Sequence, residues 1–156
     1  MGRKTATLVS TCCYCGGVVG GLEHEQTETL RRYGYNLGMA FQIADDVLDY
    51  VASSDEVGKP VGADLRQGTV TLPLMLALED ERAAAGLRPL LGKRELTDAD
   101  YETVVRLVRE SPAIESAEGH AHQFAARARG DLQSFSDTTA RRALARMCDY
   151  VVDRRI

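Results

Sequence analysis

The sequence has no tryptophan, 6% aromatic residues and only four prolines in 156 residues. No uninterrupted apolar run approaches about 18 residues, so we expect no transmembrane helix. No alternation of apolar and polar residues persists, which argues against β-strands. The net charge of −4 gives no reason to expect a nucleic-acid partner. These absences favour one all-α domain over residues 1–156.

Cysteine and histidine show no metal-binding pattern. Cys12, Cys13 and Cys15 crowd into one segment, whereas a structural zinc site requires paired spacings. We interpret these residues and Cys148 as free thiols of a reduced, cytoplasmic protein, because the apolar start of the chain is diluted by threonines and lacks a signal-peptide cleavage site. The histidines at 120 and 122 cannot share a helical face, so we place them toward solvent.

Helical spacing and end signals divide the chain into predicted helices. We expect helices over about 4–19, 23–51, 71–85, 97–110 and 112–135, and a last one from 137 or 138. Thr97 with Asp100 resembles a capping box. Residues 53–70 are predicted to form a pliable loop that carries Lys59. A loop of this length in a compact domain is usually functional or disordered, and its place after the second helix favours function.

The second predicted helix has an unusual surface. No lysine, arginine or glutamate occurs from Tyr33 to Ala52, and apolar residues cover most of its circumference, which is typical of a buried helix. Its remaining side carries Gln42 and the three aspartates Asp45, Asp46 and Asp49. Buried carboxylates need compensating cations, and Mg²⁺ is the expected one. The alternative is a solvated acidic edge on an ordinary bundle helix.

Five blocks of the sequence resemble, in order and spacing, the all-trans polyprenyl diphosphate synthases. They are Lys4-Thr5-Ala6, Tyr33-Gly34, the block from Gly38 to Asp49 with its DDxxD motif, the block from Gly58 to Leu65, and Thr71-Leu72-Pro73. The resemblance implies a helical bundle of the isoprenoid synthase fold. It also implies a Mg²⁺-dependent prenyltransferase of isoprenoid biosynthesis, which condenses an allylic prenyl diphosphate with isopentenyl diphosphate.

The resemblance also implies roles for individual residues. Asp45, Asp46 and Asp49 would serve the metal, directly or through water. Lys4, Thr5 and Lys59 would contact diphosphate, and Phe41 and Gln42 would line the pocket beside the allylic carbons. We further expect Gly34 and Gly38, on the same helix side, to leave room for a hydrocarbon chain.

The chain departs from the family pattern because it carries only the second of the family's two aspartate-rich motifs. The resemblance therefore covers about half of the isoprenoid synthase fold, the carboxy-terminal half. We expect a weakly active or inactive isolated chain that belongs to a longer synthase or to a homo- or hetero-oligomer.

A second departure is Thr69, where the family often has lysine. It removes one expected phosphate contact. The residues that set product length in this family lie near the missing motif, so this sequence does not indicate the chain length of the product.

Three other functions compete with this interpretation. The first is a non-catalytic interaction or regulatory subunit of a heteromeric synthase, which the missing motif favours. The second is a terpene cyclase, which the Gly-Lys and Gly-x-Asp-Leu sequences disfavour. A carboxylate-bridged di-iron bundle is also disfavoured, because no Glu-x-x-His sequence occurs.

Overall fold

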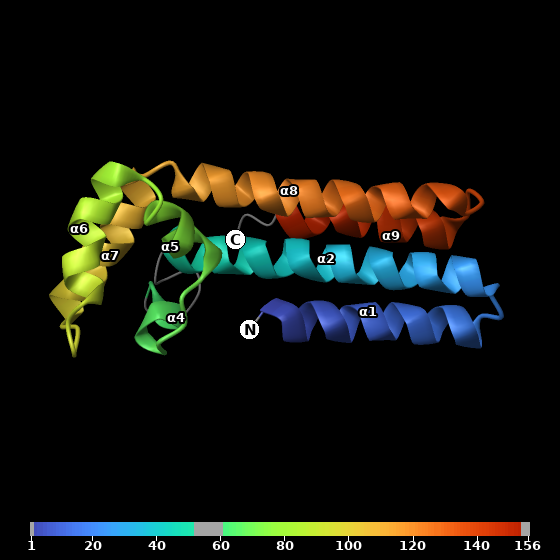
Figure 1. Cartoon of the computed structure of the whole chain (residues 1–156). Helices are drawn as coiled ribbons and strands as arrows, with labels where there is room; N and C mark the ends of the chain where they lie inside the picture. The colour runs from blue at the N-terminus through green and yellow to red at the C-terminus, as the bar shows by residue number, and fades with distance from the viewer. Residues whose placement is uncertain (1, 52–60, 154–156) are drawn as a thin grey trace. The chain divides into compact units, whose positions relative to one another are not determined.

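The computed structural model describes residues 2–51 and 61–153, with side chains from residue 4 onward, and every regular element in these ranges is helical (Figure 1). The elements in chain order are α1 (Gly2–Val19), α2 (His24–Val51), α4 (Ala63–Arg66), α5 (Leu72–Ala77), α6 (Glu81–Leu91), α7 (Asp98–Glu110), α8 (Ala113–Asp131), the 3₁₀ helix η1 (Leu132–Ser134) and α9 (Thr139–Val152). The predicted all-α class is confirmed.

The chain divides into two compact units. The first unit contains the residues up to Ala44 and those from His120 to Arg155, and the second contains Asp45 to Gly119. The helices α2 and α8 each contribute to both units. A single domain over residues 1–156 stays a prediction.

In the first unit, α1 and the first part of α2 form an antiparallel pair (Figure 1). The α1 helix ends because Gly21 adopts a positive φ of 72°, a conformation that glycine reaches without steric cost. The Leu22 N–H then donates to the Gly17 carbonyl at 3.0 Å, which closes the helix end. This turn returns the chain along α1 and brings the two helices into contact.

The core of the first unit lies between α2, the later part of α8, and α9. Tyr33 is buried there, and its hydroxyl donates to the Leu144 carbonyl at 3.0 Å. Asn36 on α2 donates to the carboxylate of Asp131, the last residue of α8, at 3.0 Å. The core residues are Tyr33, Leu37, Ala40, Ala125, Ala128, Leu132, Cys148 and Val151. Alanine on α8 lets the helices approach closely, so α2 is held on this side by packing as well as by hydrogen bonds.

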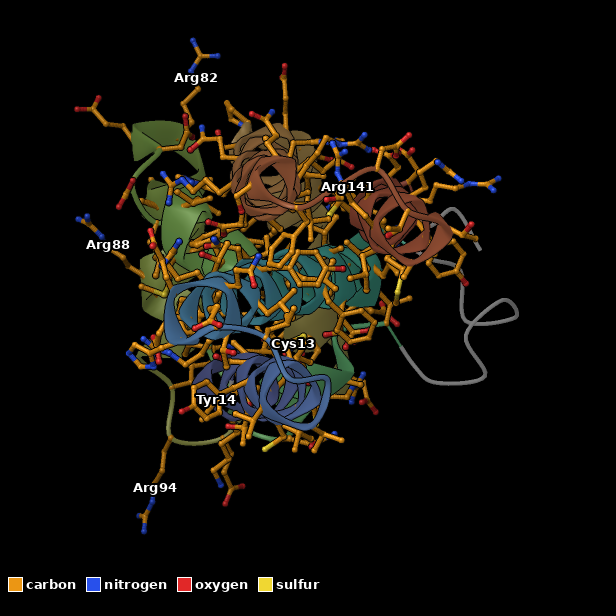
Figure 2. The ribbon with its side chains drawn as sticks, turned by 90° about the vertical axis from the view of Figure 1, so that its right-hand side faces the viewer. Cys13, Tyr14, Arg82, Arg88, Arg94 and Arg141 are labelled. Carbon is orange, nitrogen blue, oxygen red and sulfur yellow. The ribbon has the colours of Figure 1, made fainter. Side chains whose placement is uncertain are left out.

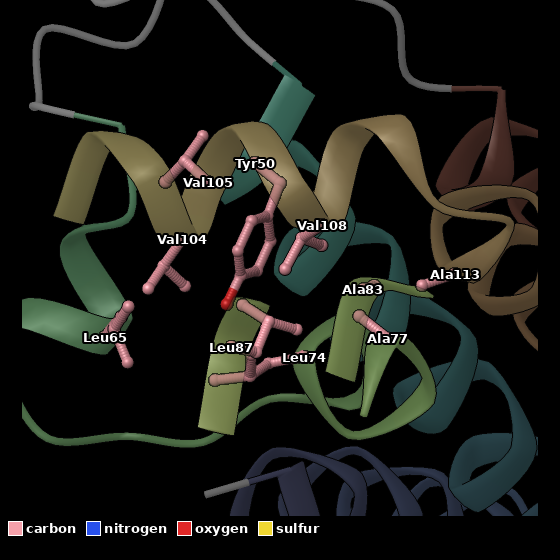
Figure 3. Packing of buried hydrophobic residues seen from close by; sticks show 10 residues of the cluster. All are labelled: Tyr50, Leu65, Leu74, Ala77, Ala83, Leu87, Val104, Val105, Val108 and Ala113. Carbon is pink, nitrogen blue, oxygen red and sulfur yellow. The ribbon is translucent and has the colours of Figure 1, made fainter. Parts of the chain in front are cut away.

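The second unit is built around Tyr50, at the end of α2 (Figure 3). Its ring lies among side chains of α5, α6 and α7 that are fully buried: Leu74, Leu87, Val104 and Val108. The Tyr50 carbonyl accepts a hydrogen bond from the Arg109 guanidinium, which ties α2 to α7. Thus the helix that carries the three aspartates ends inside an apolar core.

Several predicted elements are confirmed. The structure bears out α1, α2, α7 and α9 within one or two residues, and Thr97 and Asp100 form the predicted capping box. Both histidines at 120 and 122 are exposed, as expected. Within the part of the chain that the structure describes, no helix is long and apolar enough to cross a membrane.

The predicted helix over 71–85 is wrong. The α5 helix ends at Ala77, and α6 begins at Glu81, because the Asp80 carboxylate caps the new helix by accepting the Ala83 N–H at 2.8 Å. The predicted loop over 53–70 contains the single turn α4, while its residues 53–60 lie outside the described residues.

Candidate functional site

The helices α1 and α2 approach so closely that glycine is required at the contact. A Cβ atom added to Gly38 would lie 2.7 Å from the Ala6 Cα, and one added to Gly34 would lie 2.8 Å from the Cys13 Sγ. Figure 2 shows Cys13 between the two helices. The expectation that Gly34 and Gly38 leave room for a hydrocarbon chain is therefore wrong, because α1 fills that space.

The close approach brings two predicted substrate-contacting residues together. The Thr5 hydroxyl on α1 donates to the Gln42 side-chain carbonyl on α2 at 3.1 Å. Gln42 lies one helical turn beyond Gly38, and Thr5 is next to Ala6, so the glycine contact sets this distance. Lys4 is exposed at the start of α1, and Phe41 packs partly buried against the core of the first unit.

The predicted apolar circumference of α2 is confirmed, but the aspartate side is more open than expected. Ile43, Val47 and Tyr50 are buried. Asp45 is exposed, whereas Asp46 and Asp49 are half-buried. The expectation that the whole trio is shielded from bulk water is therefore wrong for Asp45.

Asp49 is held by backbone amides. Its two carboxylate oxygens accept the N–H groups of Ala63 and Asp64 at 3.0 and 3.1 Å, and its own carbonyl accepts the Gly62 N–H at 2.9 Å. Burial raises the pKa of the Asp49 carboxyl above its usual value. The two amide bonds oppose this rise, and the nearby carboxylates of Asp64 and Asp45 add to it.

The aspartates are suited to supply some of the ligands of a metal ion, with the other ligands coming from outside the protein. Among residues 4–51 and 61–153, no group of three or more His, Cys, Asp or Glu side chains is arranged to hold a metal ion. Mg²⁺ in proteins is often bound by one or two carboxylates, with substrate phosphate and water as its other ligands. Asp45 and Asp46 are oxygen donors of this type, so the donor set fits Mg²⁺ bound together with a diphosphate.

The predicted site residues fall into two groups. Lys4, Thr5, Phe41 and Gln42 belong to the first unit, and the three aspartates to the second. Lys59 lies outside the described residues. The assignment of both groups to one site is a prediction from the order of residues along α2.

Comparison with solved structures defines the class of protein. The chain superposes on a polyprenyl synthase from Caulobacter crescentus, solved with calcium and isoprenyl diphosphate, with a TM-score of 0.89 at 38% identity. The match covers 99% of this chain and 48% of that one. Heptaprenyl diphosphate synthase from Staphylococcus aureus matches with a TM-score of 0.90 at 26% identity, over 98% of this chain and 48% of its own. The fold is thus about half of that of the isoprenyl diphosphate synthases.

Sequence comparison gives the family. The family model "Polyprenyl synthetase" matches residues 1–108, and the chain belongs to this family. Nonaprenyl diphosphate synthase from Mycobacterium tuberculosis is 41% identical over 97% of this chain and 46% of its own length. Component 2 of heptaprenyl diphosphate synthase from Bacillus subtilis is 33% identical over 98% of this chain and 43% of its own length. The chain therefore spans about half the length of these curated relatives.

Proposed function

We propose that this chain is the carboxy-terminal part of a Mg²⁺-dependent prenyltransferase that joins an allylic prenyl diphosphate to isopentenyl diphosphate. The observation that carries the proposal is the aspartate motif on α2 in a chain of the polyprenyl synthetase family. Allylic C–O ionisation leaves a carbocation and a diphosphate, and the double bond of isopentenyl diphosphate attacks the cation. Loss of a proton then gives a product that is one five-carbon unit longer.

Each proposed residue has a part in this reaction. Mg²⁺ would neutralise the charge that develops on the departing diphosphate. Asp45, Asp46 and Asp49 would hold it, directly or through water. The ammonium groups of Lys4 and Lys59 and the hydroxyl of Thr5 would bind diphosphate oxygens, and these contacts strengthen as the leaving group gains charge. Phe41 and Gln42 would line the pocket beside the allylic carbons.

We also propose that a partner supplies the first aspartate motif. The α1 helix has no charged residue from Thr5 to Val19, and Leu8 and Val19 are 66% and 89% exposed. An exposed apolar face of this kind is typical of an interface. Two relatives are themselves named component 2 of heptaprenyl diphosphate synthase, which supports a heteromeric enzyme. We place this enzyme in the cytoplasm.

The test is a prenyl transfer assay with labelled isopentenyl diphosphate, an allylic diphosphate and Mg²⁺. The chain is assayed alone and mixed with the amino-terminal half of the Mycobacterium tuberculosis relative, called here the complementary half. We expect product from the mixture and little from either part alone. Rapid turnover by the isolated chain would contradict the requirement for a partner.

A non-catalytic interaction subunit is the second candidate, because the chain lacks the first aspartate motif. Such a subunit would bind the complementary half without contributing reacting groups. It predicts that the activity of a natural complex survives the loss of Asp45, whereas the prenyltransferase proposal predicts that activity is lost.

A further inference from the structure

Three consecutive backbone amides converge on Asp49. The N–H groups of Gly62, Ala63 and Asp64 donate in turn to its carbonyl oxygen, its Oδ1 and its Oδ2, at 2.9, 3.0 and 3.1 Å. Both carboxylate oxygens and the carbonyl therefore accept hydrogen bonds from one short segment. The two bonds to the carboxylate are charge-assisted, and such bonds are roughly twice as strong as those between neutral groups.

The segment needs an acceptor from elsewhere in the chain. The first N–H groups of a helix have no partner inside it, and Gly62, which precedes α4, has no side chain to supply one. Asp49, fourteen residues before Ala63, supplies the missing acceptors. The bond is long-range in sequence, so it fixes α4 against the end of α2.

Packing around the segment leaves it little freedom. Gly62 has a φ of 74°, and a Cβ atom there would lie 2.9 Å from the Val105 Cγ2 on α7. Leu65, on the turn that Asp49 caps, is buried in the core around Tyr50. Capping by Asp49 and burial of Leu65 thus hold the same turn from two sides.

The carboxylates of the motif consequently differ in their surroundings. Asp45 is exposed on α2, whereas both Asp49 oxygens point at amides of α4. A metal bound directly by Asp49 would have to share or displace these amide bonds. We infer that Asp49 is a positioning residue that fastens α4 to α2, and that direct coordination of the metal falls to the other aspartates of the motif. The part of this inference that concerns metal rests on the proposed function.

The experiment measures two properties of the full chain. The first is amide hydrogen exchange at Ala63 and Asp64. The second is the affinity for Mn²⁺ in the presence of inorganic pyrophosphate, followed by electron paramagnetic resonance. The variants are Asp49→Asn, which keeps one acceptor oxygen, Asp49→Ala, which keeps none, and Asp45→Asn. Gly62→Ala disturbs the same turn without touching a carboxylate.

We expect exchange at Ala63 and Asp64 to rise about tenfold or more in Asp49→Ala and less in Asp49→Asn. Gly62→Ala raises it as well, whereas Asp45→Asn leaves it unchanged. Affinity for Mn²⁺ falls about tenfold or more in Asp45→Asn and less than about threefold in Asp49→Asn, which retains part of the cap.

Two results would overturn the inference: unchanged exchange in Asp49→Ala, or a loss of Mn²⁺ affinity in Asp49→Asn as large as in Asp45→Asn. If the wild-type chain and its complex with the complementary half bind no Mn²⁺ with pyrophosphate, the proposed metal site fails. Exchange at the two amides then still decides whether Asp49 holds α4.

Discussion

Gly38 offers the sharpest test of how α1 is seated on α2. In Gly38→Ala, the new methyl carbon would lie 2.7 Å from the Ala6 Cα and 3.3 Å from the Ala6 Cβ. Ordinary van der Waals contact begins at 3.4 Å, so α1 must move away by about 0.7 Å or more. Overpacking of this kind costs about 1–3 kcal/mol, against about 1 kcal/mol gained because alanine favours helix over glycine.

Gly130→Ala is the matched control. Gly130 also lies in a helix of the first unit, and a Cβ atom there meets nothing within 4 Å. The control keeps the propensity gain without the clash, so it should stabilise the chain by about 1 kcal/mol. The difference between the two variants then measures overpacking alone, and we expect about 1–3 kcal/mol.

The assay is urea unfolding followed by far-ultraviolet circular dichroism. Hydrogen exchange of α1 amides serves as a local readout, because the two units need not unfold together. We expect Gly38→Ala to be less stable than Gly130→Ala and to exchange faster in α1. Equal stabilisation by both variants would refute the close contact between Ala6 and Gly38.

Three other predictions concern single side chains. The Tyr50 hydroxyl is buried, and the Thr71 hydroxyl near it does not form a hydrogen bond of ordinary geometry with it, so Tyr50→Phe should stabilise the chain by about 1 kcal/mol in urea unfolding. Burial raises the pKa of Tyr50 to about 12. The part of the folding stability that depends on keeping Tyr50 protonated is therefore fully present below pH 10 and is lost as the pH rises toward 12. A stability profile over pH 10–12 that is no flatter in the phenylalanine variant would contradict this assignment. Thr97→Ala removes the α7 cap and should cost about 1 kcal/mol. An unchanged urea midpoint in Thr97→Ala would count against the cap. The pKa of its capping-box partner Asp100 is lowered to about 2, chiefly by its hydrogen bond from Lys93. The stability that ionised Asp100 adds is therefore present above about pH 4 and disappears toward pH 2. Thr5→Val deletes the donor to Gln42 and should lower kcat/KM for the allylic diphosphate about fivefold in the mixture with the complementary half, while Thr103→Val on α7 should not.

Much of the helical layout could be predicted because it depends on local signals. The capping box at Thr97 is a local pattern, and so is the glycine at position 21 that ends α1. The break between α5 and α6 was not predicted, because no glycine or proline interrupts the sequence from Leu74 to Ala85. Asp80 three residues before Ala83 is itself a capping signal, and it could have placed the start of α6.

The sequence indicated candidate site residues but gave few of their contacts. The order of motifs indicated both Thr5 and Gln42, and the structure joins them. Sequence could not tell whether a substrate or another helix fills the space beside Gly38, because a glycine permits either. The small residue Ala6 in α1 was the available hint.

The amides on Asp49 were not foreseen. They come from a segment that is adjacent to Asp49 only after folding. The remaining signal was Gly62 immediately before a one-turn helix that lacks its own cap.

The central claim is that the aspartates of α2 take part in prenyl transfer. It is tested most directly by the rate of product formation in the mixture with the complementary half, compared between the wild-type chain and Asp45→Ala. Binding of the two parts is checked by native mass measurement. The account predicts an intact complex whose rate falls about 100-fold or more, because the leaving diphosphate loses charge stabilisation. An intact complex with an unchanged rate would contradict the claim and identify the chain as an interaction subunit.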